Sequence, residues 1–426
     1  MTLRPADSWY EATARRDAPL APLAGDIDAD VCVIGAGLSG CSTAMHLAER
    51  GYKVVVLEAE RVGYGASGRS GGQIIPGWAG GTDKLAAQLG KADARRVWDF
   101  STEGVELTRE LIERNRIDCD LAWGHMHVAL KPRQRQELLD MQREQEEDFG
   151  YRKLRFMERE ETASWIASQR YVAGLHDSGA GHLHPLRYTI GVGKAAIAAG
   201  ARIYENSEVT DIRYGPTVTV RTASGGVRAK FLAICANVGN VELSRRLARK
   251  LIGVASYIVA TKPLDAGRAA GLLRDNIAVA DLNWIIDYYR LSADHRLLFG
   301  GRVSYSGLDP LGTARATRQR MVNVFPQLAD VEIDYAWGGM IDITMSRLPN
   351  FGRLEPNVYY LQGYSGHGMV ATTVAGRILA EAIAGQAERF DVMARIKHHD
   401  FPGGKLFRRP TLVMAMTWFR LRDLMP

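Results

Sequence analysis

Residues 31–40 read Val-Cys-Val-Ile-Gly-Ala-Gly-Leu-Ser-Gly, and residues 54–58 read Val-Val-Val-Leu-Glu. An apolar strand, a Gly-x-Gly-x-x-Gly turn, a helix and a second strand ending in an acid form the fingerprint of a dinucleotide site. Gly35 allows the tight turn, Gly37 lets a diphosphate approach the backbone, and Gly40 lets the helix pack closely on the sheet. A ligand-free βαβ unit is the alternative, but both strands, the helix and the acid favour a bound dinucleotide.

The start of the helix supplies the contacts of this site. Backbone N–H groups and the helix dipole favour a diphosphate there. The acid that ends the second strand can accept hydrogen bonds from a ribose diol. The predicted contacts are Gly35, Ala36, Gly37, Leu38, Ser39, Gly40, Glu58, Ala59 and Arg61.

A second glycine-rich segment decides between NAD and FAD. Residues 61–73 read Arg-Val-Gly-Tyr-Gly-Ala-Ser-Gly-Arg-Ser-Gly-Gly-Gln. A nicotinamide domain runs directly from its second strand into a helix, whereas FAD has a ribityl chain and a three-ring head that need further contacts. The segment therefore favours FAD over NAD, with a flexible surface loop as the alternative. The predicted contacts are Ala66, Ser67, Arg69, Ser70, Gly71, Gly72 and Gln73.

Two distant segments support FAD. Residues 208–213, 217–222 and 230–236 have the pattern of three short strands, and they lead into a turn at 234–239. Residues 358–362 indicate another strand, followed by a glycine-rich loop and a helix over 371–384. A helix N-terminus at the flavin ring stabilises the negative charge that reduction adds. The predicted contacts are Val209, Gly239, Gly366, His367, Gly368 and Met369.

Motifs along the whole chain carry a family resemblance. They are residues 30–37, 55–58, 65–69, 71–73, 117–120, 181–185, 287–291, 325–328, 351–354, 362–368 and 401–404. On these motifs the chain resembles the D-amino-acid-oxidase-type FAD oxidoreductases, and within them the γ-glutamylputrescine oxidoreductases. The glycine motifs specify the superfamily strongly, and the middle motifs indicate the branch.

The dinucleotide motifs lie at the start, middle and end of the chain, which predicts two interleaved domains. We expect an α/β (α+β) fold with a Rossmann-like FAD-binding domain and a substrate domain on a mainly antiparallel sheet. The FAD-binding domain takes residues 28–80, 176–240 and 338–395, and the substrate domain takes 81–175 and 241–337. Residues 1–27 and 396–426 are terminal extensions.

The resemblance implies oxidation of a carbon–nitrogen bond: a neutral amine transfers a hydride to flavin N5, and the imine is hydrolysed to a carbonyl. The sarcosine-oxidase branch clamps a small α-carboxylate with two cations, where this chain has Pro76 and Val370. An unpaired carboxylate would be poorly held, so small N-methyl amino acids are disfavoured. Ile341 stands where that branch has its flavin-tethering cysteine, so we expect non-covalent FAD.

A longer amine such as γ-glutamylputrescine needs a site for its ammonium and a site for its glutamyl head. Residues 281–290 are interpreted as one strand of the substrate sheet, whose aromatic and acidic side chains could guide an ammonium. The candidate substrate residues are Trp78, Asp287, Tyr289, Trp337 and Arg347, with Arg302 as a further cation. Packing within the core is the alternative for both tryptophans and for the strand.

His367 lies between two glycines in the late loop and is the tentative catalytic residue at the flavin face, with a structural role as the alternative. His182 and His184 are interpreted as structural residues near a helix start. The sequence shows neither a metal site nor a catalytic triad. It identifies no oxygen-activating lysine.

Composition narrows the remaining classes. The chain has 426 residues, a net charge of +6 and four cysteines without metal or disulfide spacing. Scattered, often paired charges argue against nucleic-acid binding, and the first 25 residues lack a secretory pattern. We therefore expect a cytoplasmic protein, with peripheral membrane contact through the tail at 412–422 as an alternative to docking on the protein body. Oligomeric state stays open.

The sequence thus predicts an FAD-dependent amine oxidase or dehydrogenase that converts a γ-glutamylated polyamine to an aldehyde, with O2 or another acceptor reoxidising the flavin to complete turnover. With O2 the product is H2O2. The alternatives are oxidation of another secondary amine or a D-amino acid, and a non-catalytic FAD-binding protein.

Overall fold

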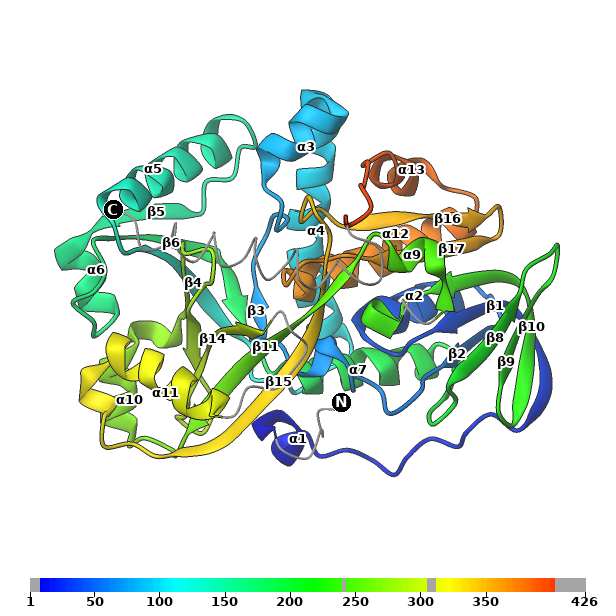
Figure 1. The fold of residues 1–426 in the computed structure, drawn as a ribbon, viewed down its shortest axis with the longest axis horizontal. Helices are drawn as coiled ribbons and strands as arrows, with labels where there is room; N and C mark the ends of the chain where they lie inside the picture. Colours follow the sequence, from blue (N-terminus) through cyan, green and yellow to red (C-terminus); the bar gives the residue numbers. More distant parts are fainter. Residues whose placement is uncertain (1–7, 240–242, 305–311, 403–426) are drawn as a thin grey trace.

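Two sheets lie side by side in the computed structural model, which describes residues 8–239, 243–304 and 312–402 (Figure 1). The first sheet has the order β16-β17-β10-β1-β2-β7, and β9 joins it beside β10 with β8 at its outer edge. Its strands are β1 (Gly25–Ile34), β2 (Val54–Leu57), β7 (Arg202–Tyr204), β8 (Val209–Arg213), β9 (Val218–Thr222), β10 (Gly225–Ile234), β16 (Asn350–Glu355) and β17 (Val358–Gln362).

The centre of the first sheet is parallel, because β1 pairs in parallel with β2 and β10, and β10 with β17. A parallel strand is covered on both faces, which explains the continuous apolar run at the end of β1. Val31 and Val33 pack into one core with the helices, whereas Cys32 and Ile34 pack into a second core on the opposite face.

The second sheet has the order β15-β11-β14-β13-β12-β4-β6-β3, with β5 beside β6. All its pairs are antiparallel except β12 with β4. Its strands are β3 (Gln73–Ile74), β4 (Ala122–Ala129), β5 (Leu154–Glu158), β6 (Ala173–His182), β11 (Ile252–Thr261), β12 (Ala278–Asp281), β13 (Tyr288–Leu291), β14 (Leu297–Ser304) and β15 (Ile333–Ile343).

Helices cover both sheets. The α-helices of the described residues are α1 (Trp9–Thr13), α2 (Leu38–Ala48), α3 (Thr82–Leu89), α4 (Lys91–Arg114), α5 (Pro132–Glu147), α6 (Arg159–Trp165), α7 (Pro185–Ala198), α9 (Arg245–Ala248), α10 (Ala266–Leu272), α11 (Thr313–Val324), α12 (Gly368–Ile383) and α13 (Glu388–Ala394). Helices α2, α4, α7 and α12 share the largest core, and α10 and α11 cover one face of the second sheet. None of the described helices combines the length and the apolar character needed to cross a membrane.

The predicted fold class, a Rossmann-like domain interleaved with a mainly antiparallel sheet, is confirmed. The strands expected over 208–213, 217–222, 230–236 and 358–362 are present as β8, β9, β10 and β17. The helix expected over 371–384 begins earlier, at Gly368. The tail at 412–422, with its predicted membrane contact, lies outside the described residues.

The prediction of one strand over residues 281–290 is wrong. Strand β12 ends at Asp281 and β13 begins at Tyr288, and the Asp281 N–H donates to the Asp287 carbonyl oxygen at 2.9 Å. The two strands are antiparallel neighbours. The aromatic and acidic residues between them therefore form a hairpin loop rather than one face of a sheet.

Three predicted domain boundaries differ from the sheet membership. Residues 176 and 338 fall inside β6 and β15, which continue unbroken through them. Gln73 and Ile74 pair with β6 in the second sheet, although they were expected in the FAD-binding domain. Helix α4, expected in the substrate domain, packs on α12. The division into domains remains a proposal.

Candidate active site at the junction of the two sheets

The first glycine motif forms a tight turn into an uncapped helix. Gly35 has φ +97°, and a Cβ on Gly40 would lie 1.9 Å from the Gly35 carbonyl oxygen, so both positions require glycine. Gly37 is the N-cap of α2 and has no side chain that could accept from the helix N–H groups. The Leu38 N–H donates to Ser67 Oγ at 3.0 Å, which brings the second glycine segment over the first.

Glu58 lies directly after β2 and holds this turn. Its Oε2 accepts a hydrogen bond from the Ala36 N–H at 2.6 Å, and its Oε1 accepts one from the Glu60 N–H at 3.0 Å. Burial raises the pKa of the Glu58 carboxyl despite these two donors. Arg61 is occupied differently, because its Nε pairs with Glu205 at 2.9 Å.

The second glycine segment crosses between the sheets. Ala66–Gly68 forms a short 3-10 turn. Gln73 Nε2 donates to the Val279 carbonyl oxygen at 3.0 Å in the second sheet, and Ser70 Oγ lies 3.3 Å from Met369 Sδ at the start of α12. A Cβ on Gly71 would lie 2.8 Å from the Tyr288 ring. Three predicted segments therefore meet here.

Arg69 is the cation at this junction. Its Nε donates to the Tyr64 carbonyl oxygen at 2.8 Å, and its guanidinium lies 4.6 Å from the centroid of the Tyr64 ring. Its Nη1 donates to the Gly338 carbonyl oxygen at 3.3 Å. Its Nη2 is buried without a protein partner. Buried donors are normally paired, so this nitrogen indicates a ligand.

The third glycine motif forms the N-terminus of α12. His367 is the N-cap, and no side chain caps this helix either. The Nε2 of His367 lies 3.1 Å from the Ile75 carbonyl oxygen, which requires that this nitrogen carries the proton. Burial lowers the pKa of His367, so the imidazole is neutral at neutral pH.

Asp342 joins this motif to the middle of the chain, a role that no motif indicated. Its Oδ2 accepts a hydrogen bond from the Gly363 N–H at 2.5 Å. With its amide turned to donate, the Asn237 side chain lies 2.7 and 2.8 Å from the two carboxylate oxygens. Asn237–Gly239 is the turn after β10, so Gly239 adjoins the same junction, whereas Val209 starts β8 at the edge of the sheet.

The substrate candidates are mostly engaged within the protein. Trp78 is buried and donates to the Val97 carbonyl oxygen at 2.8 Å. Tyr289 is buried beside Phe299 and donates to the Tyr171 hydroxyl at 2.8 Å. Both are thus engaged by protein groups, as their packing alternative expects, and their roles as substrate contacts stay predictions.

The other candidates differ in position. Asp287 is buried and pairs with Arg320 at 2.6 Å. Arg347 lies over the Trp284 ring at 4.0 Å. Trp337 alone reaches the junction, where its Nε1 donates to the Arg69 carbonyl oxygen at 3.1 Å. The Arg302 side chain lies outside the described residues.

The histidine near α7, the cysteines and the possible metal ligands were also considered in the sequence. His184 is the N-cap of α7, and its Nδ1 accepts from the Arg187 N–H at 3.2 Å, as its structural interpretation expects. All four cysteines are buried and unpaired. Within residues 8–239, 243–304 and 312–402, no three His, Cys, Asp or Glu side chains are grouped as around a metal ion.

The residues at the junction fit FAD. The uncapped N-termini of α2 and α12 suit its diphosphate and its ring, and the unpaired Arg69 Nη2 is a free donor beside them. Bound FAD supplies a two-electron acceptor that no amino-acid side chain provides. His125 and His127 lie on β4 of the second sheet, and no sequence motif had singled them out.

Comparison with known proteins identifies the family. The family of FAD dependent oxidoreductases matches residues 30–382. The chain is 42% identical to γ-glutamylputrescine oxidoreductase of Escherichia coli K12, covering 98% of each chain. It is 40% identical to the probable oxidoreductase OrdL of Haemophilus influenzae, covering 98% of this chain and 97% of that one.

A solved structure of similar fold is glycine oxidase from Geobacillus kaustophilus. Its TM-score is 0.73 at 21% identity, covering 87% of this chain and 99% of that one. A second is L-proline dehydrogenase from P. horikoshii, with a TM-score of 0.71 at 19% identity, covering 89% of this chain and 98% of that one. These two similarities concern the fold. From the family match and the two relatives, the chain is an FAD-dependent oxidoreductase of the D-amino-acid-oxidase type.

Proposed function

We propose that the protein oxidatively deaminates a γ-glutamylated polyamine of the γ-glutamylputrescine kind to an aldehyde. The E. coli relative bears the name of this activity at 42% identity over nearly the full length of both chains. Identity at this level, distributed over both sheets, supports a shared class of substrate.

The proposal rests on the apolar residues near His367, where the flavin ring is expected. Pro76 follows Ile75, whose carbonyl oxygen contacts His367, and Val370 is buried in the first turn of α12 against Gly104. These two apolar residues stand where an α-carboxylate clamp would need cations. A substrate whose carboxylate lies far from the reacting carbon avoids the cost of an unpaired charge there.

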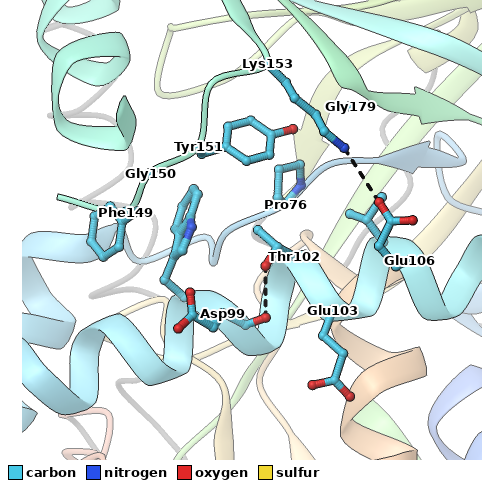
Figure 2. Close-up of a pocket in the computed structure, with 12 residues that line it drawn as sticks. Pro76, Asp99, Thr102, Glu103, Glu106, Phe149, Gly150, Tyr151, Lys153 and Gly179 are labelled. Atoms are coloured by element: carbon cyan, nitrogen blue, oxygen red, sulfur yellow. Dashed lines mark hydrogen bonds and ion pairs between the residues drawn. The ribbon is translucent and has the colours of Figure 1, made fainter. Parts of the chain in front are cut away.

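A pocket beside Pro76 suits the distant head of such a substrate. It has a volume of about 430 Å³ and lies between α4 and the segment before β5 (Figure 2). Lys153 and Glu106 both line it and form an ion pair at 3.6 Å, and Trp98, Phe149 and Tyr151 are its aromatic lining. A γ-glutamyl head carries both an ammonium and a carboxylate, so a pocket with both signs of charge can bind it.

The proposed reaction balances as follows. The C–H and N–H bonds of the amine lose two electrons and two protons to give an imine, and water converts the imine to an aldehyde and ammonia. O2 takes up the two electrons and two protons to give H2O2. The protein's part is to orient the amine at the start of α12, where the neutral His367 adds no positive charge to repel it.

The test is anaerobic reduction of the holoenzyme followed by flavin absorbance. γ-Glutamylputrescine should bleach the flavin rapidly, whereas N-acetylputrescine, which has the same amine without the glutamyl charges, should react more slowly. Putrescine, sarcosine and D-amino acids complete the panel. Rapid bleaching by sarcosine or a D-amino acid alone would overturn the proposed substrate. Bleaching by none of these compounds would favour a non-catalytic FAD-binding protein.

A matched pair of variants tests the pocket. Lys153→Met removes the cation that we assign to the glutamyl carboxylate, and Lys91→Met removes a lysine at the start of α4 that does not line the pocket. Lys153→Met should raise the KM for γ-glutamylputrescine about tenfold, as loss of one charge-assisted hydrogen bond does. It should leave the slow reaction of N-acetylputrescine unchanged. Equal effects on both amines would contradict the assignment.

A further inference from the structure

Strand β4 carries two histidines on one face. Residues 125 and 127 are separated by two positions, so both side chains point to the same side of the second sheet. Met126 and Val128 point to the other side, into the core beneath α10 and α11. The rings of His125 and His127 are in edge contact, with centroids 4.6 Å apart and planes at 66°.

The local geometry of β4 is irregular where this pair begins. The register against β6 shifts between Trp123 and His125, and the residue between them, Gly124, has φ +109°. Such irregularities re-aim side chains and are frequent beside active sites. The residues paired with His125 and His127 are Ala278 and Ala280 on β12, and Asp177 and Leu175 on β6.

The two imidazoles lack protein partners. His125 is fully buried, and neither of its ring nitrogens has a hydrogen-bond partner. The Nδ1 of His127 is also buried and unpaired. Buried polar side chains are normally satisfied. Three unpaired nitrogens on one face therefore indicate a polar ligand that the folded chain itself does not provide.

The pair lies on the sheet that the start of α12 contacts. His367 contacts the Ile75 carbonyl oxygen directly after β3, and β3 and β4 are the two neighbours of β6 in the sheet order. Burial lowers the pKa of His127 to about 4, and that of His125 falls well below its usual value. Both imidazoles are therefore neutral, and each has one nitrogen that accepts a hydrogen bond.

We propose that His125 and His127 form the subsite for the reacting nitrogen of the substrate, where an imidazole nitrogen accepts a hydrogen bond from the amine N–H. The inference rests on the proposed function for its amine substrate, and it adds the residues that hold the amine. A neutral acceptor pair orients the nitrogen without stabilising the ammonium as a carboxylate would, and oxidation of the C–N bond requires the unprotonated amine.

The experiment compares two ligands that differ only in this nitrogen. γ-Glutamylputrescine has the terminal amine, and N-butyl-γ-glutamine is the same molecule with a hydrogen atom in place of that amine. Calorimetric titration of the dithionite-reduced holoenzyme under argon gives the Kd of each, because reduced flavin oxidises neither. The wild-type protein should bind the amine about tenfold more tightly, the value of one additional hydrogen bond.

The variants locate that preference. His127→Leu should bring the two Kd values to within about twofold, by raising the Kd of the amine while that of the butyl ligand stays the same. His127→Asn, which retains an acceptor, should recover part of the preference. His176→Leu is the matched control, since His176 is paired with Met126 and lies beside Trp165 on the opposite face. Bound-flavin absorbance reports folding of each variant.

Two outcomes would overturn the inference. An unchanged preference in both His127→Leu and His125→Leu would show that the amine does not contact the pair. Equal loss of affinity for both ligands in these variants, with no recovery in His127→Asn, would assign the histidines a structural role.

Failure of the proposed function would be visible separately. In that case wild-type protein neither binds nor is reduced by γ-glutamylputrescine. The Kd values are then compared for another pair of ligands. One is the amine, among putrescine, sarcosine and the D-amino acids, that does reduce the flavin, and the other is the same molecule without its amine. Reduction by no amine would overturn both proposals.

Discussion

The backbone N–H of Ala36 donates to Glu58 Oε2 at 2.6 Å, joining the glycine turn after β1 to the end of β2. The second oxygen of the same carboxylate accepts from the Glu60 N–H. One side chain thus fixes the two segments that define the dinucleotide fingerprint. Because it is bound to the backbone on two sides, the carboxylate is already oriented before a cofactor enters.

Removing this carboxylate should weaken FAD binding. Glu58→Ala loses hydrogen bonds to a charged acceptor, each worth about 1.5–3 kcal/mol, so we expect the Kd for FAD to rise about 10- to 100-fold. Fluorescence titration of the apoprotein with FAD measures it. Glu60→Ala is the control, since it keeps the donating N–H and removes an exposed carboxylate. Equal FAD affinity in all three proteins would contradict this role of Glu58.

Asp342 should make stability depend on pH. Burial raises the pKa of its carboxyl from 3.8 to about 6. Between these values the folded protein holds a proton that the unfolded chain releases, so stability falls as pH rises through this window, by about 3 kcal/mol in total. Asp342→Asn should lack this component. Urea unfolding at pH 4 and pH 7 measures it.

The Asn variant retains an oxygen that can accept from Gly363, so the turn before α12 should persist. The measurement is therefore the difference between the two pH values, not the stability at either one. A pH dependence in Asp342→Asn equal to that of the wild type would place the titrating group elsewhere.

The crossing of α2 and α12 depends on a glycine. A Cβ on Gly376 would lie 2.5 Å from Ser42 Cβ and 2.6 Å from the Thr43 backbone nitrogen. Gly376→Ala should therefore lower the free energy of unfolding by about 1–3 kcal/mol, because the helices must move apart. Gly271→Ala in α10 is the control, since its Cβ meets nothing within 4 Å. There the substitution should stabilise by about 0.5–1 kcal/mol. If Gly376→Ala and Gly271→Ala both destabilised the protein, the loss would come from replacing a helical glycine in general and not from the contact between α2 and α12.

The ion pair of Asp287 with Arg320 should matter for stability and not for the substrate. Arg320→Met leaves the buried Asp287 unpaired beside Asp281, whose pKa is already raised to about 8 by burial and by Asp287. Breaking a buried pair costs about 3–5 kcal/mol, and since Arg320 is one-third exposed we expect about 1–3 kcal/mol. Thermal unfolding measures it, with exposed Arg315→Met as control. A changed KM for the amine would return Asp287 to the substrate site.

The local elements of the cofactor site were predictable. The spacing of Gly35, Gly37 and Gly40 fixes a turn and a helix start through backbone sterics, which act within a few residues. The apolar runs of β1 and β17 likewise identify strands buried on both faces. Those features required no knowledge of the rest of the chain.

Where the prediction was wrong, a hydrogen bond that the residue pattern does not show decided the local structure. Residues 281–290 alternate as a strand would, but the hydrogen bond between Asp281 and Asp287 closes a hairpin. Trp78 and Tyr289 have the chemistry of a substrate wall, and each is buried in one of the two large cores. Residue type does not show which face of an element is covered.

The sequence by itself therefore determined the cofactor, the family and the position of the strands and glycine turns along the chain, because glycine turns and apolar periodicity are local properties. Only the tertiary structure brought Asp342 to Asn237 and Gly363, and left Arg69 Nη2 and three ring nitrogens of His125 and His127 without a partner. Asp342 is 105 positions from Asn237 and 21 positions from Gly363. Sheet pairing and burial decide these relationships, and no short pattern of residues encodes either.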